Sequence, residues 1–156
     1  MELNTRGRYA VMAMADLARQ GGDQAVPLSQ ISDRQKITVA YLEQLFQQLR
    51  RAGLVDSARG RSGGYRLARS AADITVADVL AAVEEGTRMT RCVGHGAEPC
   101  LAGERCLTHN LWEALGDEIA AFLGRVSLKD VIDGLPRRDT AAGEHAWADA
   151  RSGADR

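Results

Sequence analysis

Three cysteines and one histidine near the middle of the chain are the residues whose types and spacing could do chemistry. They are Cys92, Cys100, Cys106 and His109, and seven, five and two residues separate them in order. Thiolates and an imidazole suit zinc, copper or iron-sulfur clusters, so ligand type alone does not select the metal. The closely spaced cysteine pairs of structural zinc sites are absent here, whereas wide spacings let a loop surround a larger core. Because a 2Fe-2S cluster needs four protein ligands, we expect these four residues to hold one.

Two histidines compete for the fourth ligand position. His109 lies three residues beyond Cys106, at the first turn of an expected helix, so both side chains can face one centre. His95 lies in the loop between two glycines and is the alternative, whereas His145 is expected to be inert. An odd number of cysteines without an export signal disfavours a disulfide framework. Thiol redox sensing without a metal is the remaining alternative.

The elements that must position this segment begin with a helix-turn-helix. We expect Thr5 to cap a first helix that ends at about Arg19, a second helix over 28–35, and a third helix that Thr38 caps and that runs to Ala52. The inward face of the first helix is predicted to hold Tyr9, Met12, Ala13 and Leu17. The third helix carries apolar residues at helical spacing, which predicts a buried stripe: Leu42, Leu45, Phe46 and Leu49. The second and third helices, joined by a tight turn, form a helix-turn-helix, a motif typical of DNA-binding proteins.

The opposite face of the third helix is polar. It holds Ala40, Gln44, Gln47 and Arg51, with Glu43 and Gln48 at its flanks. Glutamine can bond both N6 and N7 of adenine, and glutamate can accept a hydrogen bond from N4 of cytosine. A solvated polar face is the alternative interpretation. We expect Glu43 to weaken binding to sequences that offer no such donor, unless it forms an intrahelical pair with Arg50 or Gln47.

Two short strands around a glycine-rich, basic tip predict a hairpin wing over about 54–68. Arg59 and Arg61 at this tip are suited to reach phosphates or a narrow minor groove. Together with this basic wing, the polar face of the third helix is better explained by binding to double-stranded DNA than by contact with solvent alone. Charge supports this, since residues 1–69 carry 11 basic and 6 acidic side chains, whereas residues 70–156 carry 9 and 15.

The second half of the chain predicts a scaffold for the cysteine segment. Thr75 and Asp78 form a capping-box pattern for a fourth helix to about Glu85, and Ser127 with Asp130 marks a short final helix. A long helix is expected from near Thr108 to about Arg125. Its narrow apolar stripe is of the kind that pairs helices between subunits: Leu111, Leu115, Ile119, Phe122 and Val126.

The fold class expected from these elements is mainly α with a small β wing, a winged helix-turn-helix domain followed by a long dimerisation helix. The domain covers 1–86, the cluster-binding loop 87–107, the dimerisation helix and short terminal helix 108–135, and a disordered tail 136–156. No apolar run is long enough for a membrane span, and no secretory signal is evident, so a cytoplasmic protein is expected. Enzyme motifs such as a nucleophile triad or a phosphate-binding glycine loop are not found.

Three runs of sequence resemble the iron-sulfur cluster regulators of the Rrf family of winged-helix transcription factors. They are LNTRGRYAVMAM, TVAYLEQLFQQLRRAGLVDSARGRSGGYRLA and the cysteine segment through CLTH and LW, so the resemblance spans about residues 1–135. It implies a homodimer whose 2Fe-2S cluster is supplied by iron-sulfur assembly proteins and which represses the assembly genes when charged. The family's cluster ligands correspond to the cysteines and histidine named above, its base-reading residues to Tyr41, Glu43 and Gln44, and its wing contact to Arg59. The 92–100 interval is longer than is usual in the family, and Ala40 stands where a hydroxyl residue is common.

Two rival functions share part of this pattern. A related Rrf-type regulator that senses nitric oxide or redox state would have the same architecture, but such proteins often use an acidic ligand near the N-terminus, where this chain has Arg8. A small iron-sulfur electron carrier would need neither a basic wing nor an outward glutamine face. We therefore expect a DNA-binding regulator whose affinity for its operator depends on the cluster.

Overall fold

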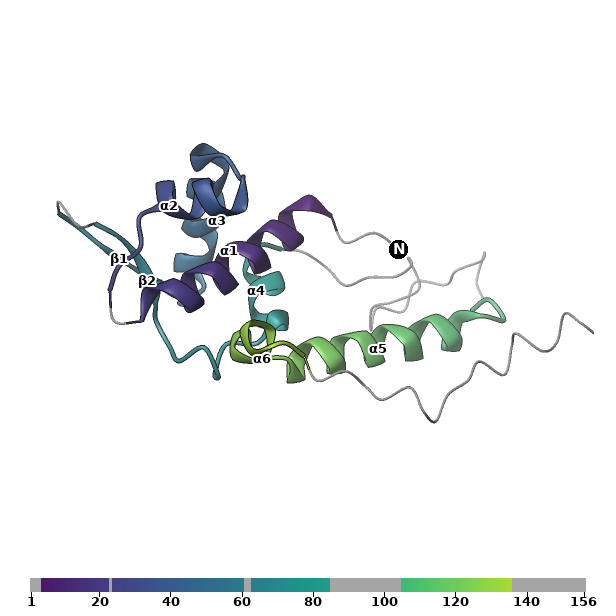
Figure 1. Ribbon diagram of the computed structural model, residues 1–156. Helices are drawn as coiled ribbons and strands as arrows, with labels where there is room; N and C mark the ends of the chain where they lie inside the picture. Colours follow the sequence, from purple (N-terminus) through teal and green to yellow (C-terminus); the bar gives the residue numbers. More distant parts are fainter. Residues whose placement is uncertain (1–3, 23, 61–62, 85–104, 136–156) are drawn as a thin grey trace, which may run out of the picture.

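The computed structural model describes residues 4–22, 24–60, 63–84 and 105–135, which form six helices and one two-stranded sheet (Figure 1). In chain order the elements are α1 (Thr5–Gly21), α2 (Leu28–Gln35), α3 (Val39–Arg51), β1 (Val55–Ala58), β2 (Gly64–Leu67), α4 (Val76–Ala82), α5 (His109–Arg125) and α6 (Leu128–Asp133). The prediction of a mainly helical fold with a small β wing is confirmed. In this part of the chain, no helix combines the length and apolar character that a membrane span needs.

The third helix packs as its sequence predicts. Thr38 caps it by accepting a hydrogen bond from the Tyr41 backbone N–H, and the helix ends where a positive-φ glycine, Gly53, follows. The predicted apolar stripe is buried without exception: Leu42, Leu45, Phe46 and Leu49. Burial of four large side chains on one face leaves the opposite face of α3 to solvent.

The first helix differs from its prediction in two ways. Asn4, not Thr5, is the N-cap, because its side-chain oxygen accepts the Arg6 backbone N–H at 2.7 Å. Of the predicted inward residues, only Ala13 and Leu17 are buried, and Ala10 and Met14 replace Tyr9 and Met12, which are half-buried. The reason is that α1 contacts α2 and α3 on one side and α4 and α6 on another, so one stripe cannot describe its burial.

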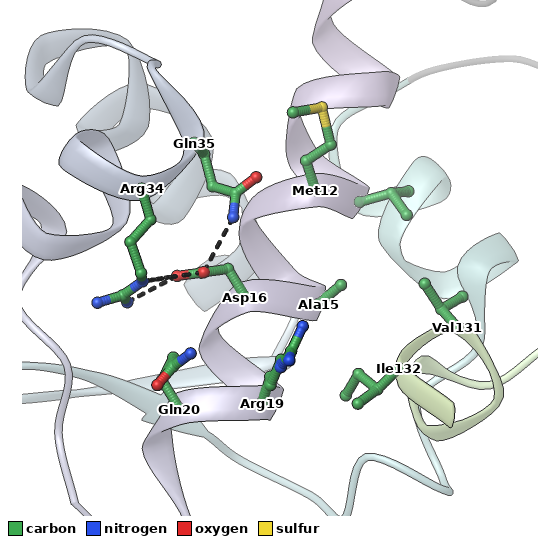
Figure 2. Close-up of a pocket in the computed structure, with 10 residues that line it drawn as sticks. Met12, Ala15, Asp16, Arg19, Gln20, Arg34, Gln35, Val131 and Ile132 are labelled. Carbon is green, nitrogen blue, oxygen red and sulfur yellow. Dashed lines mark hydrogen bonds and ion pairs between the residues drawn. The ribbon is translucent and has the colours of Figure 1, made fainter. Parts of the chain in front are cut away.

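A buried carboxylate joins α1 to the helix-turn-helix. Asp16, only 7% exposed, accepts hydrogen bonds from Nε and Nη2 of Arg34 at 3.0 and 2.7 Å and from the Gln35 amide at 2.9 Å. Figure 2 shows these side chains reaching Asp16 from α2, with Val131 and Ile132 of α6 across the adjoining hollow. The hydrogen bond to Asp16 raises the pKa of the Arg34 guanidinium. This ion pair ties α2 to α1, and no sequence pattern predicts it.

The wing is an antiparallel hairpin in which Val55 pairs with Leu67 and Ala58 with Gly64. The hairpin is anchored to the segment before α2 by a bridge between Val26 and Tyr65, whose backbone groups exchange hydrogen bonds of 2.8 and 2.9 Å. Gly64 is required at this crossing, because a Cβ atom there would lie 2.4 Å from the Val26 carbonyl group. The wing is thereby held against the segment before α2 and the helices that surround it.

The N-cap residues of α4 and α6 are paired with each other. Thr75 and Ser127 form an antiparallel bridge, and each caps its own helix in a capping box with Asp78 or Asp130, as the sequence predicts. The fourth helix ends at Ala82 instead of near Glu85, because the chain turns at Glu84, whose φ is +55°. The bridge attaches the end of α5 to the first domain.

Val126, predicted for a subunit interface, instead closes this junction. It is the C-cap of α5, is 7% exposed and packs against Val76 and Leu80 of its own chain. Its carbonyl also accepts the Val76 backbone N–H at 2.8 Å. Val126 therefore packs within its own chain, beyond the end of α5 at Arg125, and its place in a dimer interface stays a prediction.

The remainder of α5 extends away from the domain, as the green helix in Figure 1 shows, and its N-terminal end lies farthest from α6. Three large apolar side chains on it are exposed in this chain, namely Leu111 at 60%, Leu115 at 38% and Phe122 at 41%. Ile119 on the same helix is half-buried. Among the described residues α5 contacts α4, and these three side chains nonetheless remain exposed, which is unusual for large apolar groups gathered on one helix.

Candidate nucleic-acid interface and metal centre

The outward face of α3 and the wing together line a hollow of about 510 Å³. The residues around it are mostly polar: Ala40, Glu43, Gln44, Gln47, Arg50 and Tyr65. Four of the residues expected on the outward face therefore lie together, and all four are exposed. A polar, open concavity on a recognition helix has the chemistry needed to meet base edges and phosphates.

Two residues of this hollow were missed by sequence reasoning as DNA contacts. Arg50 lies seven positions beyond Glu43, so it falls within about 20° of it around the helix. Arg51, the residue expected there, is exposed on α3 but does not line the hollow. Tyr65 reaches the site from β2, with its ring packed on Phe46 at 4.8 Å between centroids. The seven-residue spacing could have identified Arg50, but nothing in the sequence places Tyr65 beside the helix.

Glu43 has no ion pair with any residue that the structure describes. The intrahelical pair with Arg50 or Gln47, the alternative considered from sequence, is not formed. Its carboxylate is exposed on the hollow and is therefore available to a ligand. A lone carboxylate at this position would repel phosphates unless a base donor meets it.

Tyr41 and Arg59 lie at the two sides of this surface. Tyr41 is half-buried, and its ring meets that of Tyr9 edge-on at 6.0 Å between centroids. Arg59 is exposed at the end of β1, before Gly60, whose φ is +118°. Arg61 lies outside the described residues. Both Tyr41 and Arg59 stay predictions as DNA contacts.

The metal site can be described only at one end. Cys106 and His109 occupy the turn that opens α5, where the His109 backbone N–H donates to the Cys106 carbonyl at 3.0 Å. Cys106 is half-buried, and His109 is 6% exposed. Cys92, Cys100 and the alternative ligand His95 lie outside the described residues, as does His145. Among the described residues alone, no group of three potential ligands is found, so the four-residue set stays a prediction.

Thr108 occupies the N-cap position of α5 but does not cap the helix with its side chain. Its hydroxyl lies 3.6 Å from Sγ of Cys106 and accepts a hydrogen bond from Nε1 of Trp112 at 3.2 Å. A hydroxyl beside a thiol can donate to the thiolate form and stabilise it. The donor set at this turn, a thiol with a hydroxyl neighbour and a nearby imidazole, therefore fits a thiolate-bound metal cluster.

A family model described as "Rrf2: Iron-dependent Transcriptional regulator" matches residues 3–134. The chain belongs to the Rrf2 family. Membership is supported by curated relatives, each called HTH-type transcriptional regulator IscR. The one from Xenorhabdus nematophila is 49% identical over 90% of this chain and 85% of its own length. The one from Escherichia coli is 44% identical over 93% and 88%.

Solved Rrf2-type structures have the same fold. The structure titled T. potens IscR matches with a TM-score of 0.70 and 35% identity, over 92% of this chain and 94% of its own. The structure of CymR, described as the global cysteine regulator of B. subtilis, matches with a TM-score of 0.72 and 30% identity, over 85% and 97%. This Rrf2 chain is therefore a DNA-binding transcriptional regulator with a winged-helix fold, and not an enzyme. The electron-carrier alternative is not supported.

Proposed function

We propose that this Rrf2 regulator senses the cell's iron-sulfur status through a 2Fe-2S cluster held by Cys92, Cys100, Cys106 and His109. Charged with the cluster, it represses the genes for iron-sulfur assembly, whose protein products deliver the cluster to it. The observation that carries the proposal is the position of Cys106 and His109, which open a helix whose other end is bridged to the DNA-reading domain. The IscR name of the relatives and the family's iron-dependent description support it.

The residues at the start of α5 fit the proposed ligand set. When bound, the cluster would link the segment before α5 to the helix itself through sulfur and nitrogen bonds to iron. The Thr108 hydroxyl would stabilise the Cys106 thiolate, and the largely buried His109 would be kept from water.

A homodimer through α5 is part of the proposal. Leu111, Leu115, Ile119 and Phe122 form an apolar stripe along a helix that stands away from its own domain. Covering it with the same helix of a second copy would remove this apolar surface from water, as two-fold interfaces do. Two recognition helices would then meet successive turns of one face of the operator.

Contacts within the chain indicate how cluster binding at the start of α5 could change the position of the DNA-binding surface. The backbone of Val76 bonds to Val126 at 2.8 Å, and that of Leu128 bonds to Ile74 at 2.9 Å, so a displacement of α5 is passed to α4. α4 packs on α1 and α3, which holds the recognition surface. A difference of about 1.4 kcal/mol between the two placements would change operator occupancy tenfold.

The test compares anaerobically reconstituted protein with cluster-free protein on promoter DNA. We expect two iron and two sulfide per chain, visible absorption, and different affinities of the two forms for at least one class of operator. Cys106→Ala should abolish the cluster, and His109→Ala should lose it where His95→Ala retains it. Protein that stays iron-free after exposure to assembly proteins, or equal affinities on every promoter, would overturn the proposal.

A further inference from the structure

Of the described residues that line the hollow between α3 and the wing, Arg50 alone carries a positive charge. Glu43, Gln47 and Arg50 follow one another along this face at helical spacing, so a carboxylate and a guanidinium line the same hollow about 10 Å apart along the helix axis. The two side chains therefore suit different groups of a nucleic acid, a base donor near Glu43 and an anion near Arg50.

A hydrogen bond to the wing holds this guanidinium in place. Nη1 of Arg50 donates to Oγ of Ser57 in β1 at 3.3 Å, which is its single side-chain bond within the described part of the chain. None of the ion pairs in that part of the chain includes Arg50. A guanidinium has five N–H donors, so most of them are left for a ligand, and the charge is not neutralised by a carboxylate.

The position of Arg50 along α3 indicates which part of DNA it would meet. Arg50 lies ten residues beyond Ala40, which corresponds to about 15 Å along the helix axis. The N-terminal residues of a recognition helix contact base edges, and the major groove is about 8.5 Å deep. Residues near the C-terminal end of a recognition helix can contact the sugar-phosphate backbone, where a planar guanidinium binds phosphate with two parallel hydrogen bonds.

We propose that Arg50 is a phosphate clamp for duplex DNA and that Ser57 is the positioning residue that orients it. The clamp would fix the register of the recognition helix, so that Glu43 and Gln44 meet the base edges in one alignment. This inference rests on the DNA binding of the family and is independent of cluster sensing. Its ligand is a phosphodiester group, and so its contribution does not depend on base sequence.

The test measures the affinity of full-length protein for two selected operator duplexes and one unselected duplex at several salt concentrations. We expect Arg50→Gln to weaken binding to all three by a similar factor, about tenfold or more, because a charge-assisted contact is lost. The slope of log affinity against log salt should fall by about 0.9 per bound protomer, since one phosphate is no longer neutralised. Arg19→Gln on α1 makes the same charge change away from this surface and should leave the slope unchanged.

Ser57→Ala tests the positioning role. It should weaken binding severalfold with the salt slope kept, because the cation is still present but less well oriented, and Ser57→Thr should restore affinity. A loss confined to one operator would assign Arg50 to a base instead, and unchanged affinity and slope in Arg50→Gln would overturn the clamp. A change of the salt slope in Arg51→Gln but not in Arg50→Gln would assign the phosphate contact to Arg51 and overturn the proposal for Arg50. Far-ultraviolet circular dichroism and the urea midpoint confirm that each variant is folded.

Discussion

Glu43, whose carboxylate is exposed, is the residue that we expect to discriminate most strongly between operator sequences. It lines the hollow, pairs with no described cation and faces the ligand side of α3. We predict that Glu43→Ala lowers discrimination against base pairs without a cytosine-like donor by about tenfold, because each mismatch costs about 1–3 kcal/mol in such interfaces. Binding of the variant to a panel of single-base operator changes measures this effect.

Glu43→Gln is the matched control for charge at this position. It keeps the size of the side chain and removes the repulsion of phosphates, so it should bind all sequences more tightly while retaining part of the preference. If Glu43→Ala kept the full preference of the natural protein, the carboxylate would have no role in selecting sequence.

Gly64 is the position where a single methyl group should damage the wing. A Cβ atom there would clash with the backbone of Val26, which is fixed by its bridge to Tyr65. We predict that Gly64→Ala lowers the free energy of unfolding by roughly 1–3 kcal/mol, as measured by urea denaturation. Gly124→Ala on α5, where no atom lies within 4 Å of the added Cβ, should not destabilise the chain. Equal stability of Gly64→Ala and the natural protein would contradict the clash.

At the scale of elements, the junction of α4 and α6 is predicted to weaken in acid. The pKa of Asp130 is lowered by hydrogen bonds from the Ser127 hydroxyl and then from its backbone N–H. A carboxyl group with a lower pKa in the folded state stabilises that state above its unfolded pKa, and this contribution is lost as the pH falls through the folded value. The junction should therefore lose stability below about pH 4.

Asp130→Asn isolates this effect. The difference in unfolding free energy between the natural protein and the variant should be constant above about pH 5 and shrink toward about pH 3, since both then lack the charge. A difference that stays constant across this range would remove Asp130 from the acid response.

The sequence predicted well those elements whose signals are local. The capping residues Thr38, Thr75 and Ser127 and the apolar stripe of α3 all lie where the sequence placed them. The stripe of α1 was only partly correct, because this helix is covered from two sides by elements distant in sequence. Local periodicity cannot report such packing, and competing cap residues one position apart, here Asn4 and Thr5, are not separated by propensity.

Sequence could predict only those residues of the site that lie on a single element. Glu43, Gln44 and Gln47 share a helix, so their common face follows from helical geometry. Tyr65 and the bond between Arg50 and Ser57 depend on how the wing lies against α3, which no spacing encodes. These contacts become visible only when the hairpin and helix are placed together.

For the whole molecule, the decisive question is what covers the apolar stripe of α5. If a second copy covers it, as we propose, a charge within the stripe should separate the subunits, because an unpaired carboxylate would be buried there. Leu115→Glu is predicted to raise the dimer dissociation constant at least about tenfold and to weaken operator binding with it. Sedimentation velocity across a range of concentrations, together with DNA titration, measures both effects.

Ala120→Glu provides the matched control, since this exposed residue lies about 180° around α5 from Leu111. It adds the same charge to the same helix but should leave the subunits associated. Val126 cannot serve in this experiment, because it is buried against Val76 and Leu80 and a charge there would destabilise the chain itself. If Leu115→Glu remained dimeric with full affinity for its operator, α5 would not pair the subunits, and the apolar stripe would have to be covered by another partner. Loss of the dimer with preserved cluster binding would instead show that α5 carries two separable functions, ligation at its first turn and subunit pairing along its stripe.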